Sequence, residues 1–159
     1  MVTLYRLVFS TLISLFKNAN HELVLQSELV AIVVPEPEFC IQWGKDKGIL
    51  LSNMPPGINP PPPGQPPHPG LVKLCASLEF RQAVQADMDN LAKGDQLRGF
   101  EYVRAIALDP AFFTVENGLL TPTFKLKRSD AAEKFRPLID ALYKELELAT
   151  KARGINPKL

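Results

Sequence analysis

Residues 29–34 of this 159-residue chain have the sequence LVAIVV. A continuous run of apolar, largely β-branched residues that ends at Pro35 is typical of a buried β-strand. Pro37 suits the first turn of a helix, and Gly48 is placed to end that helix. Between them, apolar side chains recur at helical spacing: Phe39, Cys40 and Trp43. The sequence therefore predicts a strand followed by a short helix.

A helix and a second strand are predicted further along the chain. Residues 71–91 carry apolar side chains at helical spacing, and Gly94 is placed to end this helix. Its expected buried stripe is Leu71, Leu74, Cys75, Leu78, Val84, Met88 and Leu91. Residues 102–108, YVRAIAL, alternate in polarity and predict a strand, which Asp109 and Pro110 end.

A hairpin and a long helix complete the prediction. Asn117-Gly118 lies between residues 113–115 and 119–121 and favours a hairpin, because both residues tolerate positive φ. Ser129 is a good N-cap for the helix that follows, and Gly154 is placed to end it. Apolar residues recur along it at helical spacing: Phe135, Leu138, Ile139, Leu142 and Leu146.

Pro137 lies inside that predicted helix, where it removes a backbone donor and crowds the carbonyl of Glu133. We therefore expect a kink or a break at Pro137. The whole pattern predicts an α+β domain, with a small mixed or antiparallel sheet flanked by helices.

Nine of the fifteen prolines lie in residues 55–69. Proline fixes φ and donates no backbone hydrogen bond, so this segment is predicted to be an extended, solvated polyproline II loop. An alternative is an interaction module, because three proline pairs fit the PxxP pattern that SH3- and WW-type domains bind. These pairs are Pro60 with Pro63, Pro63 with Pro66, and Pro66 with Pro69.

The two ends of the chain raise questions of localisation. Residues 7–16 form an apolar run that is too short to cross a bilayer as a helix, and a packed helix or a signal peptide are the alternatives. Residues 4–16 could also anchor a membrane-peripheral protein. The final residues, Pro157-Lys158-Leu159, are similar to the S-K-L peroxisomal address.

The composition excludes several classes of site. The net charge of +1 creates no global field that would attract nucleic acid or an acidic membrane. No set of His, Cys and carboxylate residues has metal-ligand spacing, so we expect no metal site. Cys40 and Cys75 are expected to be half-buried thiols in a reducing compartment.

Four blocks of the chain carry a more specific pattern: residues 29–38 (LVAIVVPEPE), 99–108 (GFEYVRAIAL), 116–128 (ENGLLTPTFKLKR) and 139–146 (IDALYKEL). In this order they resemble the C-terminal lid of eukaryotic long-chain acyl-CoA synthetases, which are AMP-forming enzymes of the adenylate-forming superfamily. The resemblance divides the chain into a divergent segment 1–24, a first lid part 25–53, the proline-rich insert 54–70, a second lid part 71–153 and a tail 154–159.

The resemblance implies a fatty-acid–CoA ligase in which ATP, Mg²⁺ and CoA act in the full enzyme. The family's motif lysine matches Lys125, which is the expected catalytic residue, while Lys127 and Arg128 are further candidates for steering phosphate. Carboxylate attack on the α-phosphate brings two anions together, and a flexible ammonium would screen their repulsion. The alternative is that these three residues are only a solvated basic patch.

The phosphate-binding loop, the adenine-site motif and the ribose-binding aspartate of the family have no counterpart here. We therefore expect this chain alone to bind none of these cofactors and to leave fatty acids unactivated. Its expected partner is the missing N-terminal adenylation domain, in cis or in trans.

Overall fold

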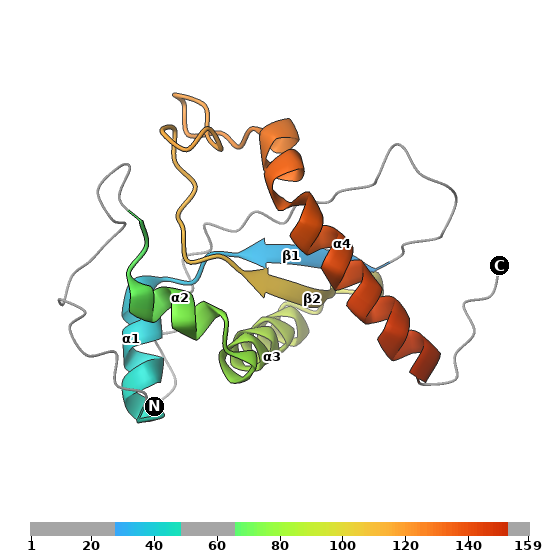
Figure 1. The fold of residues 1–159 in the computed structure, drawn as a ribbon. Helices are drawn as coiled ribbons and strands as arrows, with labels where there is room; N and C mark the ends of the chain where they lie inside the picture. The colour runs from blue at the N-terminus through green and yellow to red at the C-terminus, as the bar shows by residue number, and fades with distance from the viewer. Residues whose placement is uncertain (1–27, 49–65, 153–159) are drawn as a thin grey trace.

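The computed structural model describes residues 28–48 and 66–152. Within these ranges a two-stranded sheet lies between one long helix and three shorter helices (Figure 1). In chain order the elements are β1 (Leu29–Val33), α1 (Pro37–Asp46), α2 (Pro69–Cys75), α3 (Leu78–Gly94), the 3-10 helix η1 (Gly99–Glu101), β2 (Val103–Leu108) and α4 (Arg128–Ala152). The predicted α+β class is confirmed, as are both strands and the helix that begins at Pro37.

The two strands run parallel, from the pair Leu29 and Val103 to the pair Val33 and Leu108. We expected a mixed or antiparallel sheet, and antiparallel pairing is present in the described residues only as an isolated bridge between Leu120 and Leu126. A parallel pair needs a long crossover, which α1, α2 and α3 provide. Strand direction is set by that crossover and not by the apolar pattern of either strand.

Successive residues of β1, and Val34 directly after it, pack into two different cores. Val30, Ile32 and Val34 pack on the α4 side of the sheet, whereas Ala31 and Val33 pack on the side covered by α1, α2 and α3. Side chains alternate between the faces of a strand, so a strand buried on both faces shows a continuous apolar run. This arrangement explains why LVAIVV carries no polar residue.

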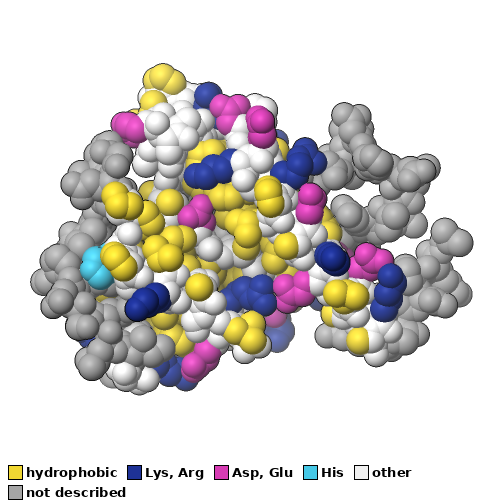
Figure 2. Space-filling model, viewed as in Figure 1, with side chains coloured by type: hydrophobic (Ala, Val, Ile, Leu, Met, Phe, Trp, Pro, Cys, Tyr) yellow, Lys and Arg dark blue, Asp and Glu magenta, His cyan; other side chains and the backbone are white. Residues whose placement is uncertain are grey.

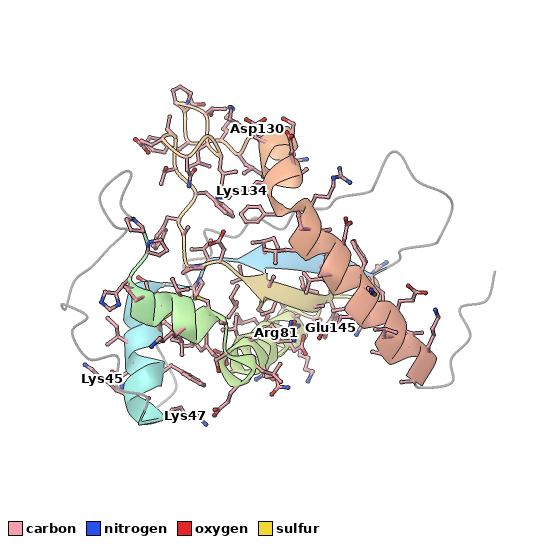
Figure 3. The ribbon with its side chains drawn as sticks, in the orientation of Figure 1. Lys45, Lys47, Arg81, Asp130, Lys134 and Glu145 are labelled. Carbon is pink, nitrogen blue, oxygen red and sulfur yellow. The ribbon has the colours of Figure 1, made fainter. Side chains whose placement is uncertain are left out.

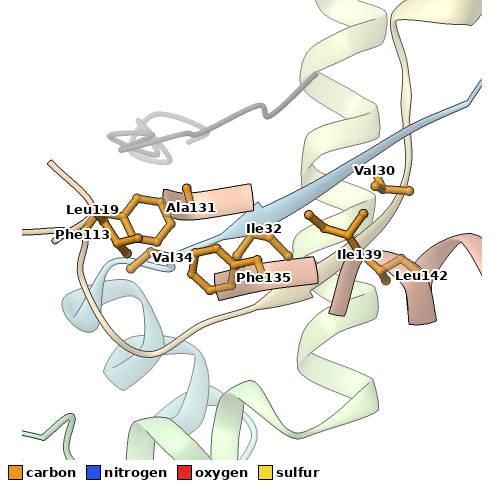
Figure 4. Close-up of a cluster of buried hydrophobic side chains, with 9 residues drawn as sticks. All are labelled: Val30, Ile32, Val34, Phe113, Leu119, Ala131, Phe135, Ile139 and Leu142. Atoms are coloured by element: carbon orange, nitrogen blue, oxygen red, sulfur yellow. The ribbon is translucent and has the colours of Figure 1, made fainter. Parts of the chain in front are cut away.

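The α4-side core includes an aromatic pair, Phe113 and Phe135, with ring centroids 5.5 Å apart (Figure 4). Its buried members are Val30, Ile32, Val34, Phe113, Leu119, Ala131, Phe135, Ile139 and Leu142. Residues of β1, of α4 and of the segment between β2 and α4 therefore share one apolar cluster. This cluster fixes where that connecting segment lies.

The opposite core is centred on Phe80, which is fully buried. Its ring centroid lies 4.9 Å from that of Trp43 and 6.0 Å from that of Phe39. Aromatic pairs at these tilted geometries add to the burial of apolar area. These ring contacts connect α1 to α3 on the side of the sheet opposite α4.

The single helix expected over residues 71–91 is wrong, because the chain breaks it into α2 and α3. Ser77 is the N-cap of α3, and its hydroxyl accepts a hydrogen bond from the amide of Phe80 at 3.5 Å. The break turns Leu78 out of the expected stripe, so that 57% of it is exposed. Leu91 is exposed as well.

The end of the predicted proline-rich loop belongs to a helix. Pro69 and Gly70 lie in the first turn of α2, where a missing amide donor costs nothing. The Nδ1 atom of His68 accepts a hydrogen bond from the Gly70 amide at 3.1 Å and so caps this helix. The rest of the proline-rich segment up to residue 65 lies outside the described residues, as do the predictions for residues 1–24 and 154–159.

We expected a kink or a break at Pro137, and of these the break is wrong, because α4 continues through Pro137 from Arg128 to Ala152 (Figure 1). Pro137 itself is exposed, while Phe135 and Ile139 on either side of it are buried in the α4-side core. Packing of an amphipathic face supplies most of a helix's stability in a protein, and here it outweighs the lost hydrogen bond. Leu138, expected in the buried stripe, is 43% exposed.

The start of α4 also differs from the prediction. Ser129 was expected to be the N-cap, but the helix begins at Arg128 and the Ser129 hydroxyl donates to the Asp130 carboxylate at 2.9 Å. Further along α4, Glu145 accepts two hydrogen bonds of 3.1 Å from the Arg81 guanidinium (Figure 3). This bidentate pair joins α3 to α4 across the edge of the sheet.

Candidate functional site

The candidate site is the end of the segment that connects β2 to α4, and it is anchored in the α4-side core. Leu119 is 1% exposed, and Leu120 and Leu126 pack against the same cluster. Leu120 pairs with Leu126, and the Lys127 amide donates to the Leu119 carbonyl at 2.9 Å. Buried Leu119 and the partly buried pair Leu120 and Leu126 therefore hold both ends of the turn formed by residues 121–125.

Asn117 fixes the approach to that turn. Its side-chain oxygen accepts from the amides of Thr114 and Leu119, and its side-chain nitrogen donates to the Phe112 carbonyl at 2.7 Å. Gly118 follows with φ of +77°, which a residue with a Cβ adopts rarely. The Asn-Gly pair thus forms a turn, as predicted.

The hairpin arms predicted on either side of Asn117-Gly118 are wrong. One backbone hydrogen bond joins them, from the Leu120 amide to the Thr114 carbonyl at 3.0 Å. The antiparallel pairing is instead shifted along the chain and closes around residues 121–125. Burial of Leu119 in the core decides this pairing, and that is a tertiary effect the local turn signal does not contain.

Three hydrogen bonds close the turn at residues 121–125. The Thr121 amide donates to the Lys125 carbonyl at 2.7 Å, and the Phe124 amide donates to the Thr121 carbonyl at 2.8 Å. The Lys125 amide donates to the Thr121 hydroxyl oxygen at 3.1 Å. The backbone on both sides of the Lys125 side chain is therefore held in one conformation.

Phe124 adopts a left-handed conformation, with φ of +56°. A bulky residue in this region is a genuine outlier, and such strain is maintained by the surrounding hydrogen bonds. The side chain is 78% exposed. The turn therefore carries an exposed aromatic ring directly before its lysine.

Lys125 is exposed at the end of this turn, opposite Thr121. Within residues 28–48 and 66–152, no hydrogen bond or ion pair engages its ammonium group. A charge on a long, flexible stem is thus presented to solvent from a fixed backbone. It is available to meet an anionic group brought from outside.

Lys127 and Arg128, the two other candidates, are arranged differently. The Lys127 ammonium forms a 2.7 Å ion pair with the carboxylate of Asp130, which is labelled at the start of α4 in Figure 3. The hydrogen bonds from Lys127 and from the Ser129 hydroxyl lower the pKa of Asp130. Arg128 is exposed as the first residue of α4. Among the described residues, Lys127 thus has a carboxylate partner and the Lys125 ammonium has none.

Other features of the described residues offer little chemistry. They hold no group of three His, Cys, Asp or Glu residues that could bind a metal ion. Burial raises the pKa of both free thiols, Cys40 and Cys75, that of Cys75 to about 12. Figure 2 shows hydrophobic, basic and acidic side chains interspersed on the face it displays. No helix among the described residues is both long and apolar enough to cross a bilayer.

Comparison with known proteins identifies the relatives of this chain. No protein-family model matches it. The peroxisomal long chain acyl-CoA synthetase 7 of Arabidopsis thaliana is 41% identical over 120 residues, which are 76% of this chain. The human long-chain-fatty-acid–CoA ligase 1 is 35% identical over 124 residues, or 78% of this chain. The matched part of this chain is homologous to the long-chain acyl-CoA synthetases.

The chain spans about 15% of the length of these synthetases. Solved structures agree at the level of the fold. The adenylation domain of a carboxylate reductase from Mycobacterium chelonae superposes with a TM-score of 0.50 at 25% identity, covering 74% of this chain and 14% of that one. The corresponding domain from Segniliparus rugosus, solved with AMP and a co-purified carboxylic acid, gives 0.51 at 22% identity, covering 76% and 14%. The small α+β unit described above is therefore found within adenylation domains.

Proposed function

We propose that this chain is the lid of an AMP-forming long-chain fatty-acid–CoA ligase, and that Lys125 is its catalytic group. The proposal rests on the exposed ammonium of Lys125, with which no residue of the described ranges forms an ion pair, on a turn whose backbone is held by hydrogen bonds. The homology to long-chain acyl-CoA synthetases supplies the class of reaction.

In the proposed reaction a fatty-acid carboxylate attacks the α-phosphate of ATP. A new bond forms between the carboxylate oxygen and phosphorus, and pyrophosphate leaves to give an acyl-adenylate. The sulfur of CoA then attacks the acyl carbonyl, and AMP leaves to give acyl-CoA. The Lys125 ammonium would act in the first step by offsetting the charge that develops where carboxylate and phosphate meet.

The proposal assigns the binding of ATP, Mg²⁺, fatty acid and CoA to a larger adenylation domain, in cis or in trans. The length ratio supports this division, because this chain matches about 15% of each relative. Lys127 and Arg128 are proposed to steer phosphate, with Lys127 acting only while its ion pair with Asp130 is open. A peroxisomal location is proposed from the two Arabidopsis relatives whose names state it.

The test is a chimera in which this chain replaces the matching segment of the Arabidopsis peroxisomal synthetase. ATP–pyrophosphate exchange with palmitate is measured for the chimera, for the parent with that segment deleted, and for this chain alone. We expect exchange from the chimera only. A chimera no more active than the deleted parent would refute the lid function. ATP–pyrophosphate exchange by this chain alone would refute the assignment of substrate binding to a larger adenylation domain.

A further inference from the structure

We propose that Thr121 is the residue that positions Lys125, through a hydrogen bond from the Lys125 amide to the Thr121 hydroxyl. The inference rests on the proposed function of Lys125, and it adds a residue to that function. Thr121 is a positioning residue and not a catalytic one, because it would act on the reacting groups only through Lys125.

The contacts of Thr121 span the whole turn. Its amide donates to the Lys125 carbonyl at 2.7 Å, and its carbonyl accepts from the Phe124 amide at 2.8 Å. Its hydroxyl oxygen accepts from the Lys125 amide at 3.1 Å. The peptide groups before and after the Cα of Lys125 are therefore both bound to the same residue.

The hydroxyl is the one part of this arrangement that depends on the side chain. The backbone amide of any residue except proline could make the first bond, and a backbone carbonyl could make the second, but the third needs a side-chain acceptor near the backbone. The Thr121 and Thr123 hydroxyl oxygens lie 3.0 Å apart. When Thr121 accepts from Lys125, its own proton can be donated to Thr123, which orients the acceptor lone pair toward Lys125.

The strained conformation of Phe124 makes this bond consequential. Phe124 lies between Thr121 and Lys125 with φ of +56°, and nothing in its own side chain favours that conformation. Loss of the hydroxyl bond would let the peptide between Phe124 and Lys125 rotate. The lysine stem would then leave the turn in several directions, and a small misplacement of a catalytic group costs a large part of its effect.

The structural half of the proposal is tested on the full 159-residue chain by amide hydrogen exchange and by the three-bond HN–Hα coupling of Phe124, both measured by NMR. Thr121→Val removes the acceptor at nearly constant shape, and Thr121→Ser keeps it. Thr150→Val is the matched control, because its hydroxyl bonds the Leu146 carbonyl at 2.9 Å within α4. We expect Thr121→Val to accelerate exchange at the Lys125 amide about fivefold, the usual effect of one hydrogen bond, with Thr121→Ser and Thr150→Val close to wild type.

The functional half is tested by a double-mutant cycle with Lys125 in the chimera described above. We expect Thr121→Val to lower kcat for ATP–pyrophosphate exchange about tenfold at an unchanged KM for ATP, and Thr121→Ser to restore it. When Lys125 is already alanine, we expect Thr121→Val to have no further effect on kcat. An equal loss in both backgrounds, or unchanged Lys125 amide exchange in the full chain, would overturn the positioning role. If Lys125→Ala itself leaves the chimera active, the catalytic function of Lys125 fails, and the NMR result still decides whether Thr121 holds the turn.

Discussion

Leu119 and Lys125 lie on the same short segment, yet the two ends of that segment are stabilised by different forces. Leu119 is 1% exposed and shares its apolar cluster with Phe113 and Phe135. Residues 122–125 are exposed, and hydrogen bonds to Thr121 give them their conformation. The core therefore sets where the turn lies, and the hydrogen bonds set where its lysine points. Substitutions in the first region should change stability, and substitutions in the second should change activity.

The largest expected effect is that of Leu119→Ala on stability. Truncating a fully buried leucine costs about 2–5 kcal/mol, from lost burial and from the cavity that remains. Urea unfolding followed by far-UV circular dichroism measures this loss. Leu148→Ala on α4 is the control, since Leu148 is 59% exposed and should change the unfolding free energy by less than about 0.5 kcal/mol. Equal urea midpoints for Leu119→Ala and Leu148→Ala would show that the segment between β2 and α4 is not anchored in the core.

Asn117→Ala should have an intermediate effect, because Asn117 joins the anchored part of the segment to the turn. The substitution removes side-chain bonds to Phe112, Thr114 and Leu119 and should cost about 1–2 kcal/mol. The same unfolding experiment measures it. Asn117→Asp keeps the acceptor oxygen and should recover part of the lost unfolding free energy. If Asn117→Asp is as unstable as Asn117→Ala, the side-chain oxygen does not stabilise this segment.

The smallest effect concerns the ion pair between Lys127 and Asp130 at the start of α4. The folded-state pKa of Asp130 lies below its unfolded value, so the pair's stabilising contribution is present above the unfolded pKa. It is lost as the pH falls through the lowered folded pKa. A carboxyl-carbon NMR titration should show the pKa of Asp130 rising in Lys127→Ala and unchanged in Lys125→Ala. A rise in Lys125→Ala instead would mean that Lys125 is the residue compensated by Asp130.

The sequence predicted the elements whose pattern is strong and local. An apolar run and proline positions predict β1 and α1, and an alternating pattern that Asp109 and Pro110 end predicts β2. Burial on both faces of β1 explains why its apolar run is continuous. The resemblance predicts Lys125 as the catalytic residue, and its side chain is exposed in the structure.

The errors have tertiary causes. The parallel direction of β1 and β2 depends on a crossover, and the shift of the hairpin depends on the burial of Leu119. The continuity of α4 through Pro137 depends on the packing of Phe135 and Ile139. Two further features, the N-cap of α3 and the role of Thr121, have local signals in the sequence that the prediction did not use. Ser77 before an apolar run is an N-cap pattern, and Thr121 before Pro122 is a residue type that bonds nearby backbone.

In the proposed reaction, the ammonium of Lys125 meets the phosphate and carboxylate that a larger adenylation domain holds. The most direct measurement is ATP–pyrophosphate exchange by the chimera carrying Lys125→Ala, compared with Lys73→Ala, which removes another exposed lysine on α2. We predict a loss of about 10²–10³-fold for Lys125→Ala, the range for a lost transition-state donor, and none for Lys73→Ala. Equal activity of the two variants would contradict the account.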